Sequence, residues 1–397
     1  MDQTRTLGDR VRDIRKRRGL TQRELADLSG VSDSLIRKLE QGEIGDVRLE
    51  TAHKIAIALA VPTSTLATES HAANPERGDV QQWAPVLRAL DGLHGGEPDE
   101  EPTIEGLRRS VSTAILAVLD SRYAELRVML PDLLRDAGAL VTLSVNGTQA
   151  EARRLLSQIR QITAFMMAQT WQFDAASKAI SLAIGDASDD LTEMAAIDWK
   201  CWTLIRQGRL AETRDLASRW ADDCEPRISS ATPDELSAWG RFLIRASAAA
   251  VRDNRPDEAA DFLRLARVAA AGVGKDVISQ SNPWQVFGPM TVSMFQAQNA
   301  LIHDRPDVTL NIGRQLEGRA FPLAETWNRH RLDTARAHAA LRQYGEAIGV
   351  LQQIQHSAPE WLTQQRYARD ILGQVIGRRR TLTADMRELA DFLHLAM

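Results

Sequence analysis

The sequence predicts an all-α protein with at least two folded parts. No run of residues alternates apolar and polar side chains as a half-buried strand does, whereas apolar residues recur at helical spacing along most of the chain. Ala, Leu, Arg, Glu and Gln, which favour helices, dominate, while Val and Ile are scattered. A chain of 397 residues is too long to fold around one small core, so we expect two or more domains.

The composition favours a cytoplasmic protein. No stretch approaches the roughly 18 apolar residues of a membrane span, and the first ten residues lack the apolar core of a signal peptide. Cys201 and Cys224 lie far apart and form no CxxC pair, which argues against a disulfide framework and a zinc site. We therefore expect no metal and no cofactor.

Basic residues are concentrated at the beginning of the chain. Met1–Arg23 contains eight basic and three acidic residues, although the whole chain has a net charge of −4. The remainder is therefore acidic. This asymmetry is expected if only one end of the molecule meets phosphate, although a solvated helix face gives similar runs of charge.

Three parts follow one another along the chain. Residues 1–68 form a compact block with helical patterning. Residues 69–102 are rich in Gly, Pro and acidic side chains on either side of a short helix at Val80–Leu90, as in a solvated linker. Residues 103–397 are amphipathic helix almost throughout.

Within the first block, residues 21–42 predict two short helices joined by a sharp turn. Thr21 and Glu24 form a capping box that starts the first helix. Gly30 suits the turn because a positive φ costs glycine little, and Ser32 caps the second helix. The apolar side chains expected to face the interior are Leu25, Leu28, Val31, Leu35, Ile36 and Leu39.

Helices before and after this pair complete a small domain. The helix before the pair carries the apolar stripe Leu7, Val11 and Ile14, and the one after it has a similar stripe from Leu49 to Leu59. The run RxxRGLTQxELAxxSGVSxSxIxKLExG, followed by LExAxKIAxAL, resembles the Cro and phage-repressor (XRE) family of helix-turn-helix proteins over residues 7–66. The resemblance implies that the second helix of the motif enters the major groove of DNA.

By position, the resemblance implies DNA contacts for eight residues. Gln22 is implied to touch the DNA backbone or to brace a base-reading side chain, and Arg37 to contact phosphate or a neighbouring helix. For Asp33, acceptance from a cytosine amino group and a favourable interaction with the helix dipole remain open. Base-edge contacts are implied for Ser32, Asp33, Ser34 and Lys38, and phosphate contacts for Arg15 and Arg48. For Lys38, donation to guanine and donation to phosphate both remain open.

Such a domain reads only a few base pairs, so useful specificity requires two copies on a near-palindromic operator. We therefore expect a homodimer on double-stranded promoter DNA.

Helix pairs recur through 103–397 every roughly 37 to 50 residues, as in an α-solenoid. Each pair shows a helix, a breaker or polar turn, an anchor residue and a second helix rich in Ala and Leu. An irregular helical bundle is the alternative. First helices are expected, for example, at 151–169, 190–207 and 233–253, and the anchors are Tyr123, Phe173, Leu210, Pro256, Pro306 and Tyr344.

Small residues follow several anchors, as in Asp174-Ala175-Ala176, Asp257-Glu258-Ala259-Ala260 and Glu346-Ala347-Ile348. These segments resemble tetratricopeptide repeats with lengthened helices. The whole chain resembles bacterial regulators in which an XRE domain precedes such repeats, some of which sense signalling (quorum) peptides. The resemblance implies that an effector binds to the first helices of the pairs. A peptide is the first candidate for this effector and a small metabolite is the second. Candidate ligand contacts are Trp199, Trp202, Trp239, Arg245, Gln296, Asn299, Trp327, Asn328 and Arg331.

No catalytic constellation is found. The nearest echo of a phosphate loop, Gly272–Asp276, has Asp276 where Ser or Thr is required and Ala269 where the first glycine belongs. GxSxG and HExxH are absent from the sequence. We therefore expect that this protein is not an enzyme. A regulator that sequesters a protein partner on the repeats, as an antitoxin does, remains the alternative.

Overall fold

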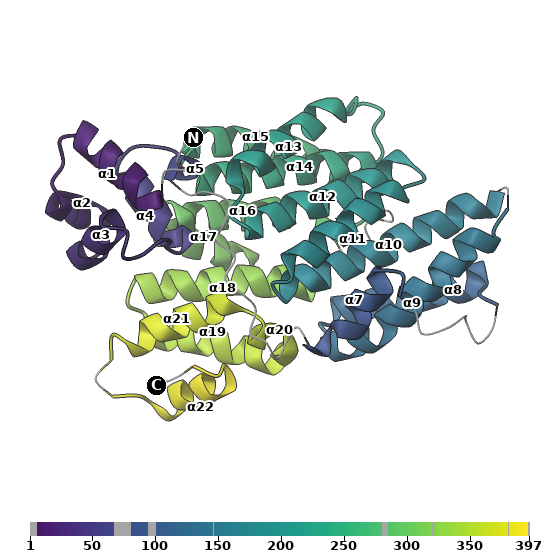
Figure 1. Cartoon of the computed structure of the whole chain (residues 1–397). Coiled ribbons are helices and arrows are strands. Elements are labelled where there is room, and N and C mark those ends of the chain that lie inside the picture. Colours follow the sequence, from purple (N-terminus) through teal and green to yellow (C-terminus); the bar gives the residue numbers. More distant parts are fainter. Residues whose placement is uncertain are drawn as a thin grey trace.

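The computed structural model shows a small N-terminal helical domain beside a long row of paired helices (Figure 1). Among the residues that the structure describes, the regular elements are helices apart from one pair of very short strands. Among the residues described, no helix is long and apolar enough to cross a membrane. The structure describes residues 6–66, 81–93, 101–145, 147–279, 285–319, 321, 323–379 and 381–395.

The N-terminal domain has a core of its own. Its buried apolar side chains, from Leu7 to Leu66, all come from this domain. Leu28, which was expected to face the interior, is instead 63% exposed on the outer side of its helix. The helices are α1 (Leu7–Arg17), α2 (Gln22–Ser29), α3 (Asp33–Glu40), α4 (Leu49–Ala58) and α5 (Thr63–Leu66).

The predicted helix signals of this domain are confirmed. The Thr21 side chain accepts from the backbone N–H of Glu24, and the Glu24 carboxylate accepts from the Thr21 N–H, which completes the capping box. Gly30 ends α2 with φ at 65°. The Ser32 hydroxyl accepts from the Leu35 N–H at 3.3 Å and caps α3.

Six helix pairs form most of the rest of the chain. The second helix of every pair begins at the predicted anchor residue. The pairs are α8 (Ile104–Leu119) with α9 (Tyr123–Leu143), α10 (Gly147–Gln169) with α11 (Phe173–Gly185), α12 (Asp190–Arg206) with α13 (Leu210–Asp223), α14 (Pro233–Arg252) with α15 (Pro256–Val273), α16 (Pro289–Ile302) with α17 (Pro306–Leu316), and α18 (Ala324–Ala340) with α19 (Tyr344–Ser357).

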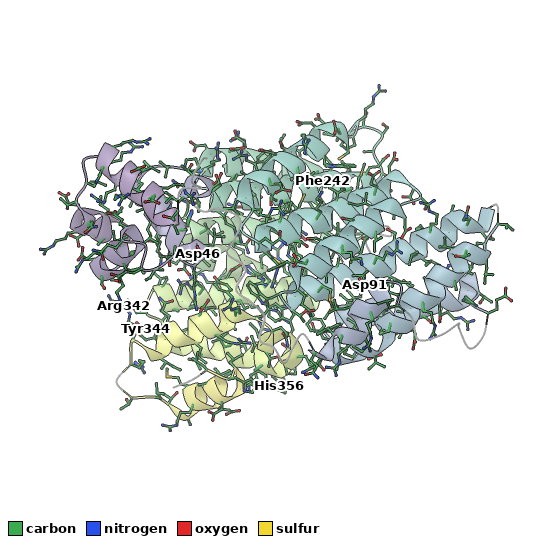
Figure 2. All side chains as sticks on the ribbon, in the orientation of Figure 1. Asp46, Asp91, Phe242, Arg342, Tyr344 and His356 are labelled. Atoms are coloured by element: carbon green, nitrogen blue, oxygen red, sulfur yellow. The ribbon has the colours of Figure 1, made fainter. Side chains whose placement is uncertain are left out.

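One backbone turn closes all six pairs. Two residues before each anchor the backbone is left-handed, and the next residue donates its N–H to the carbonyl five residues earlier. In the last pair, Arg342 has φ at 61° and Gln343 bonds to His338 at 2.9 Å, just before Tyr344 (Figure 2). This is the Schellman closure of a helix. The left-handed residues are Ser121, Trp171, Gly208, Asn254, Asp304 and Arg342.

The first helices pack side by side. α8 contacts α10, and the contacts continue through α12, α14 and α16 to α18, whereas each second helix packs mainly on first helices. The first helices therefore line the inner side of the row. The central core lies between the first helices α12 and α14 and the second helices α13 and α15, and it includes the fully buried Phe242 (Figure 2). The C-terminal end is completed by α20 (Pro359–Thr363), α21 (Arg366–Ile376) and α22 (Ala384–Phe392).

Two features depart from the sequence analysis. The strands β1 (Val277–Ile278) and β2 (Val286–Phe287) pair antiparallel between α15 and α16, and two residues per strand are too few to show alternation. The short helix of the predicted linker is α7 (Ala84–Leu90), which packs on α9 and is not a solvated connector. The predicted linker residues 69–80 and 94–100 lie outside the described residues.

We expect Gly8→Ala to destabilise the N-terminal domain by about 2 kcal/mol, because overpacking a core forces its backbone to move. A Cβ at Gly8 would lie 1.9 Å from the Leu39 carbonyl oxygen, where α1 crosses the end of α3. Thermal unfolding of the full chain by calorimetry measures the change. As a control, Gly349→Ala in α19 meets no atom within 4 Å and should stabilise its helix by about 0.5–1 kcal/mol. Equal stability of the Gly8 variant and the parent would contradict this account of the crossing.

Candidate functional site

The outer face of α3 is open to solvent. Ser34, Arg37 and Lys38 are exposed on it, while Ile36 and Leu39 are fully buried on the opposite face. In Figure 1, α2 and α3 lie at the end of the N-terminal domain away from the helix pairs, and α4 and α5 lie beside the pairs. The helix expected to meet a ligand is thus held by its domain without being covered.

Asp33 has a partner on its own helix. Arg37 donates to the Asp33 carboxylate at 2.6 Å across one helical turn, and both side chains are about half exposed. This ion pair offsets part of the negative charge that Asp33 brings to the outer face of α3. Asp33 also lies in the first turn of α3, where a carboxylate interacts favourably with the helix dipole.

Arg15 does not lie on the surface. Its guanidinium binds both carboxylate oxygens of Glu40, at 2.6 and 2.7 Å, and donates to the Leu20 carbonyl at 2.6 Å. In place of the expected phosphate contact, the structure gives Arg15 a buried ion pair that fastens α1 to the end of α3. This role could not be predicted from the local sequence, because Glu40 lies 25 residues away along the chain.

Gln22 joins the same network by donating to the Glu40 carboxylate at 2.9 Å. Burial opposes ionisation of Glu40, but the hydrogen bonds from Arg15 and Gln22 outweigh it and hold the pKa of Glu40 below its ordinary value. The hydrogen bond with Glu40 raises the pKa of Arg15. Gln22 is half-buried at the start of α2 and braces α2 against α3.

Arg48 faces the helix pairs. It donates to the Asp370 carboxylate of α21 at 2.6 Å, but its side chain is exposed, so the phosphate contact expected for it stays a prediction. Two positions further on, Glu50 accepts from Arg336 of α18 at 2.7 Å. The beginning of α4 is therefore tied to α18 and α21 by two ion pairs.

A second set of contacts ties α5 to the turn between α14 and α15. The Ser64 N–H donates to the Asp253 carboxylate at 2.7 Å, and the Asn254 amide donates to the Val61 carbonyl at 3.1 Å. His53 of α4 is buried nearby, and burial lowers the pKa of its imidazole, so the ring is neutral at pH 7. The N-terminal domain is thus docked through α4 and α5, the side opposite α3.

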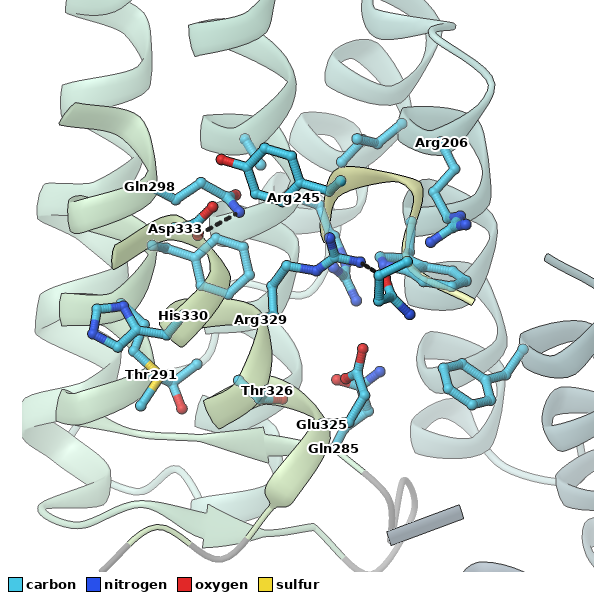
Figure 3. Close-up of a pocket in the computed structure, with 18 of the residues that line it drawn as sticks. Arg206, Arg245, Gln285, Thr291, Gln298, Glu325, Thr326, Arg329, His330 and Asp333 are labelled. Carbon is cyan, nitrogen blue, oxygen red and sulfur yellow. Dashed lines mark hydrogen bonds between the residues drawn. The ribbon is translucent and has the colours of Figure 1, made fainter. Parts of the chain in front are cut away.

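A cavity of about 370 Å³ opens among the first helices (Figure 3). Its walls come from α10, α12, α14, α16, α18 and α21, with Gln285 and Val286 beside β2. Of the nine candidate ligand contacts, Trp199, Trp202 and Arg245 line it.

The other six candidates lie elsewhere. Asn299 is buried and donates to the Ser247 hydroxyl at 2.8 Å, and Arg331 points to Gln353 of α19 at 2.6 Å. Trp239 belongs to the central core. Those outside the cavity are Trp239, Gln296, Asn299, Trp327, Asn328 and Arg331.

Most of the charged cavity residues that the sequence analysis missed are arginines. On α14, Arg241, Arg245, Ala248 and Arg252 follow one another at helical spacing and line one wall. Such a stripe of arginines in an otherwise Ala-rich helix was the signal available in the sequence. The missed charged residues are Arg206, Arg241, Arg252, Glu325, Arg329, Asp333, Arg366 and Asp370.

We expect Arg15→Ala to cost the N-terminal domain about 3 kcal/mol, because removing one partner of a buried pair leaves the other charge unpaired. The pair's contribution is present above the ordinary Glu pKa of 4.5 and is lost as pH falls through the lowered pKa of Glu40. Unfolding measured from pH 7 down to about pH 3 should therefore show the deficit shrinking below pH 4.5, as Glu40 becomes protonated. Lys16→Ala, at an exposed neighbouring position, is the control and should change little. A deficit that is absent at pH 7, or that stays constant with pH, would count against the ion pair.

Comparison with known proteins identifies part of the chain. Residues 11–66 match the helix-turn-helix family. The HTH-type transcriptional regulator SutR of Escherichia coli (strain K12) is 34% identical over 86 residues, 22% of this chain and 48% of that protein. The uncharacterized HTH-type transcriptional regulator RghRB of Bacillus subtilis (strain 168) is 39% identical over 60 residues, 15% of this chain and 43% of that protein. The chain spans less than half the length of these relatives. Its N-terminal domain is therefore a helix-turn-helix domain of the XRE family.

Proposed function

We propose that the chain is a sequence-specific transcriptional regulator that binds double-stranded DNA through α3 and is controlled by a ligand of its helical region. The observation that carries the proposal is the free outer face of α3 on a helix-turn-helix domain docked by its other side. An α-helix of this size fits the major groove, where base edges present a distinct pattern for each base pair. The two similar regulators support the same activity.

The side chains of α3 divide into two roles in this proposal. Ser34 and Lys38, exposed on the outer face, read base edges. Ser32 caps the helix and holds its N-terminus, with its N–H dipoles, toward the DNA. The Arg37–Asp33 ion pair opens on DNA in this proposal. Arg37 then contacts a phosphate, and the freed Asp33 carboxylate accepts a hydrogen bond from a cytosine amino group.

The six helix pairs act in this proposal as a tetratricopeptide-like solenoid whose inner cavity takes the effector. Supporting this, the helices that wall the cavity also carry the docked domain. Asp370 lines the cavity and binds Arg48, and Arg252, which also lines it, directly precedes the Asp253 that holds α5. A ligand that shifts α14 or α21 therefore has a direct route to the DNA-binding domain.

We expect Lys38→Ala and Ser34→Ala to change sequence preference and not merely to weaken binding. DNA selected from a random pool at a stated salt concentration gives the operator, and titrations on operator and scrambled DNA give the two affinities. Loss of a base contact should lower the affinity for the operator about tenfold or more, whereas the affinity for scrambled DNA should change little. Lys54→Ala is the control, because this exposed lysine of α4 pairs with Glu50 on the docked side. Parallel losses on both DNAs would contradict the base-reading role.

We expect the chain to bind its operator as a homodimer, because one domain reads too few base pairs for specificity. Light scattering at micromolar concentration, with and without operator, gives the mass of the complex. Half-sites in the selected DNA should lie about 10 base pairs apart, centre to centre. A monomer in both measurements, on a selected site without two-fold symmetry, would overturn this part of the proposal.

A further inference from the structure

The cavity among the first helices carries excess positive charge. Six arginines and three acidic residues line it. Arg241 and Arg245 share the buried carboxylate of Asp198, which lies behind them, at distances of 2.7 to 3.0 Å. Of the acidic lining residues, Asp370 is bound to Arg48 of the docked domain. Arg241 and Arg245 thus share one carboxylate, and the remaining acidic lining residues, Glu325 and Asp333, are fewer than the remaining arginines.

Arg206 and Arg329 lack carboxylate partners. Within the described part of the chain, neither forms an ion pair, and their hydrogen bonds go to neutral side chains, Gln169 at 3.1 Å and Gln365 at 2.9 Å. The Nε of Arg206 is buried and has no hydrogen-bond partner among the described residues. Burial, together with the nearby charge of Arg329, lowers the pKa of Arg206 to about 9. The nearby charge of Glu325 acts in the opposite direction but does not offset the burial. A desolvated cation that no carboxylate contacts directly is unfavourable, and a bound anion relieves it.

The guanidinium groups of Arg206 and Arg329 both line the cavity. Arg206 stacks on the rings of Trp171 and Trp202, 5.1 and 5.0 Å from their centroids, so its position is fixed without an acid. In Figure 3, Arg206 and Arg329 approach the cavity from opposite walls, α12 and α18. Two planar guanidinium forks facing one space match a carboxylate, which accepts paired hydrogen bonds.

Apolar and aromatic side chains line part of the cavity, among polar ones such as Gln298 and Thr326. Phe165, Met294 and Phe295 contribute from α10 and α16. A volume of about 370 Å³ lies at the lower end of the range of small-molecule sites. The cavity therefore suits a compact molecule with one charged group and an apolar body.

We propose that this cavity binds a small amphipathic carboxylate, whose charged group meets Arg206 and Arg329 and whose apolar body lies against Phe165, Met294 and Phe295. The proposal deepens the ligand control proposed above and rests on it only for the effect on DNA. The carboxylate comes from a free metabolite or from the C-terminus of a short peptide, since both present the same group.

Calorimetric titration of the full chain without DNA tests the site with two pairs of probes. 1-Naphthoate is compared with 1-naphthamide, and acetylated alanyl-phenylalanine with its C-terminal amide, because each pair differs only in the charged group. At least one acid should bind about tenfold or more tightly than its amide, as charge-assisted hydrogen bonds require. The acid with the larger preference identifies the source. Acids that bind no better than their amides, or no binding by either acid up to about 10 mM, overturn the proposal.

Variants of α18 locate the binding. Arg329→Gln should weaken the acid about tenfold and leave the amide unchanged, because only the charge-assisted contact is lost. Arg331→Gln, two positions along the same helix but directed to Gln353 of α19, is the matched control and should bind the acid as the parent does. Equal weakening by both variants overturns the assignment. Should Arg329→Gln fail to fold, the acid and amide comparison on the parent chain still decides.

Operator affinity in the presence of the bound acid separates this proposal from the preceding one. A change in affinity supports ligand control. If an acid binds in calorimetry but leaves operator affinity unchanged, the proposed carboxylate site stands and the proposed ligand control is wrong. Absence of operator binding altogether removes the regulator proposal, while the calorimetric result still stands.

Discussion

The side-by-side packing of the first helices is the constraint on which the rest of this structure depends. Contacts from α8 to α18 run through six helices in sequence. Every pair is closed by the same left-handed turn, whose left-handed residue lies two residues before the second helix begins. Five of the six left-handed residues are not glycine, and an L residue in this conformation costs about 1–2 kcal/mol. The packing of the pairs must outweigh that cost at each turn.

Much of this architecture was predictable because local signals specify it. A breaker followed by an anchor and an Ala-rich run locates the start of a helix, and all six second helices begin at the predicted residues. The caps at Thr21 and Ser32 depend on neighbours three residues away, so the sequence contains their partners. The short strands were missed because two residues show no alternation, and the packing of α7 because it depends on contacts with the distant α9.

The site was harder to predict because function depends on which way a side chain points. Asn299 was chosen on α16, yet its neighbour Gln298 lines the cavity, and one position on a helix changes direction by about 100°. Arg15 resembled a surface cation but is buried against Glu40, and Arg48 is exposed but bound to Asp370. These carboxylates lie 25 and 322 residues away in sequence. By contrast, Ser34 and Lys38 follow from the local pattern of α3 alone, and they are exposed as that pattern requires.

The docking of α4 and α5 has a mechanical consequence. Because α3 shares one small core with α4, a rotation of α4 on the helix pairs turns α3 through the same angle. α3 lies at the far end of the domain, so the domain acts as a rigid lever whose pivot is the line of contacts from Arg48 to Ser64. In a two-fold assembly, two such levers set a span that must match one turn of DNA, about 34–36 Å. Small movements at the pivot are then amplified into a mismatch that the double helix does not accommodate.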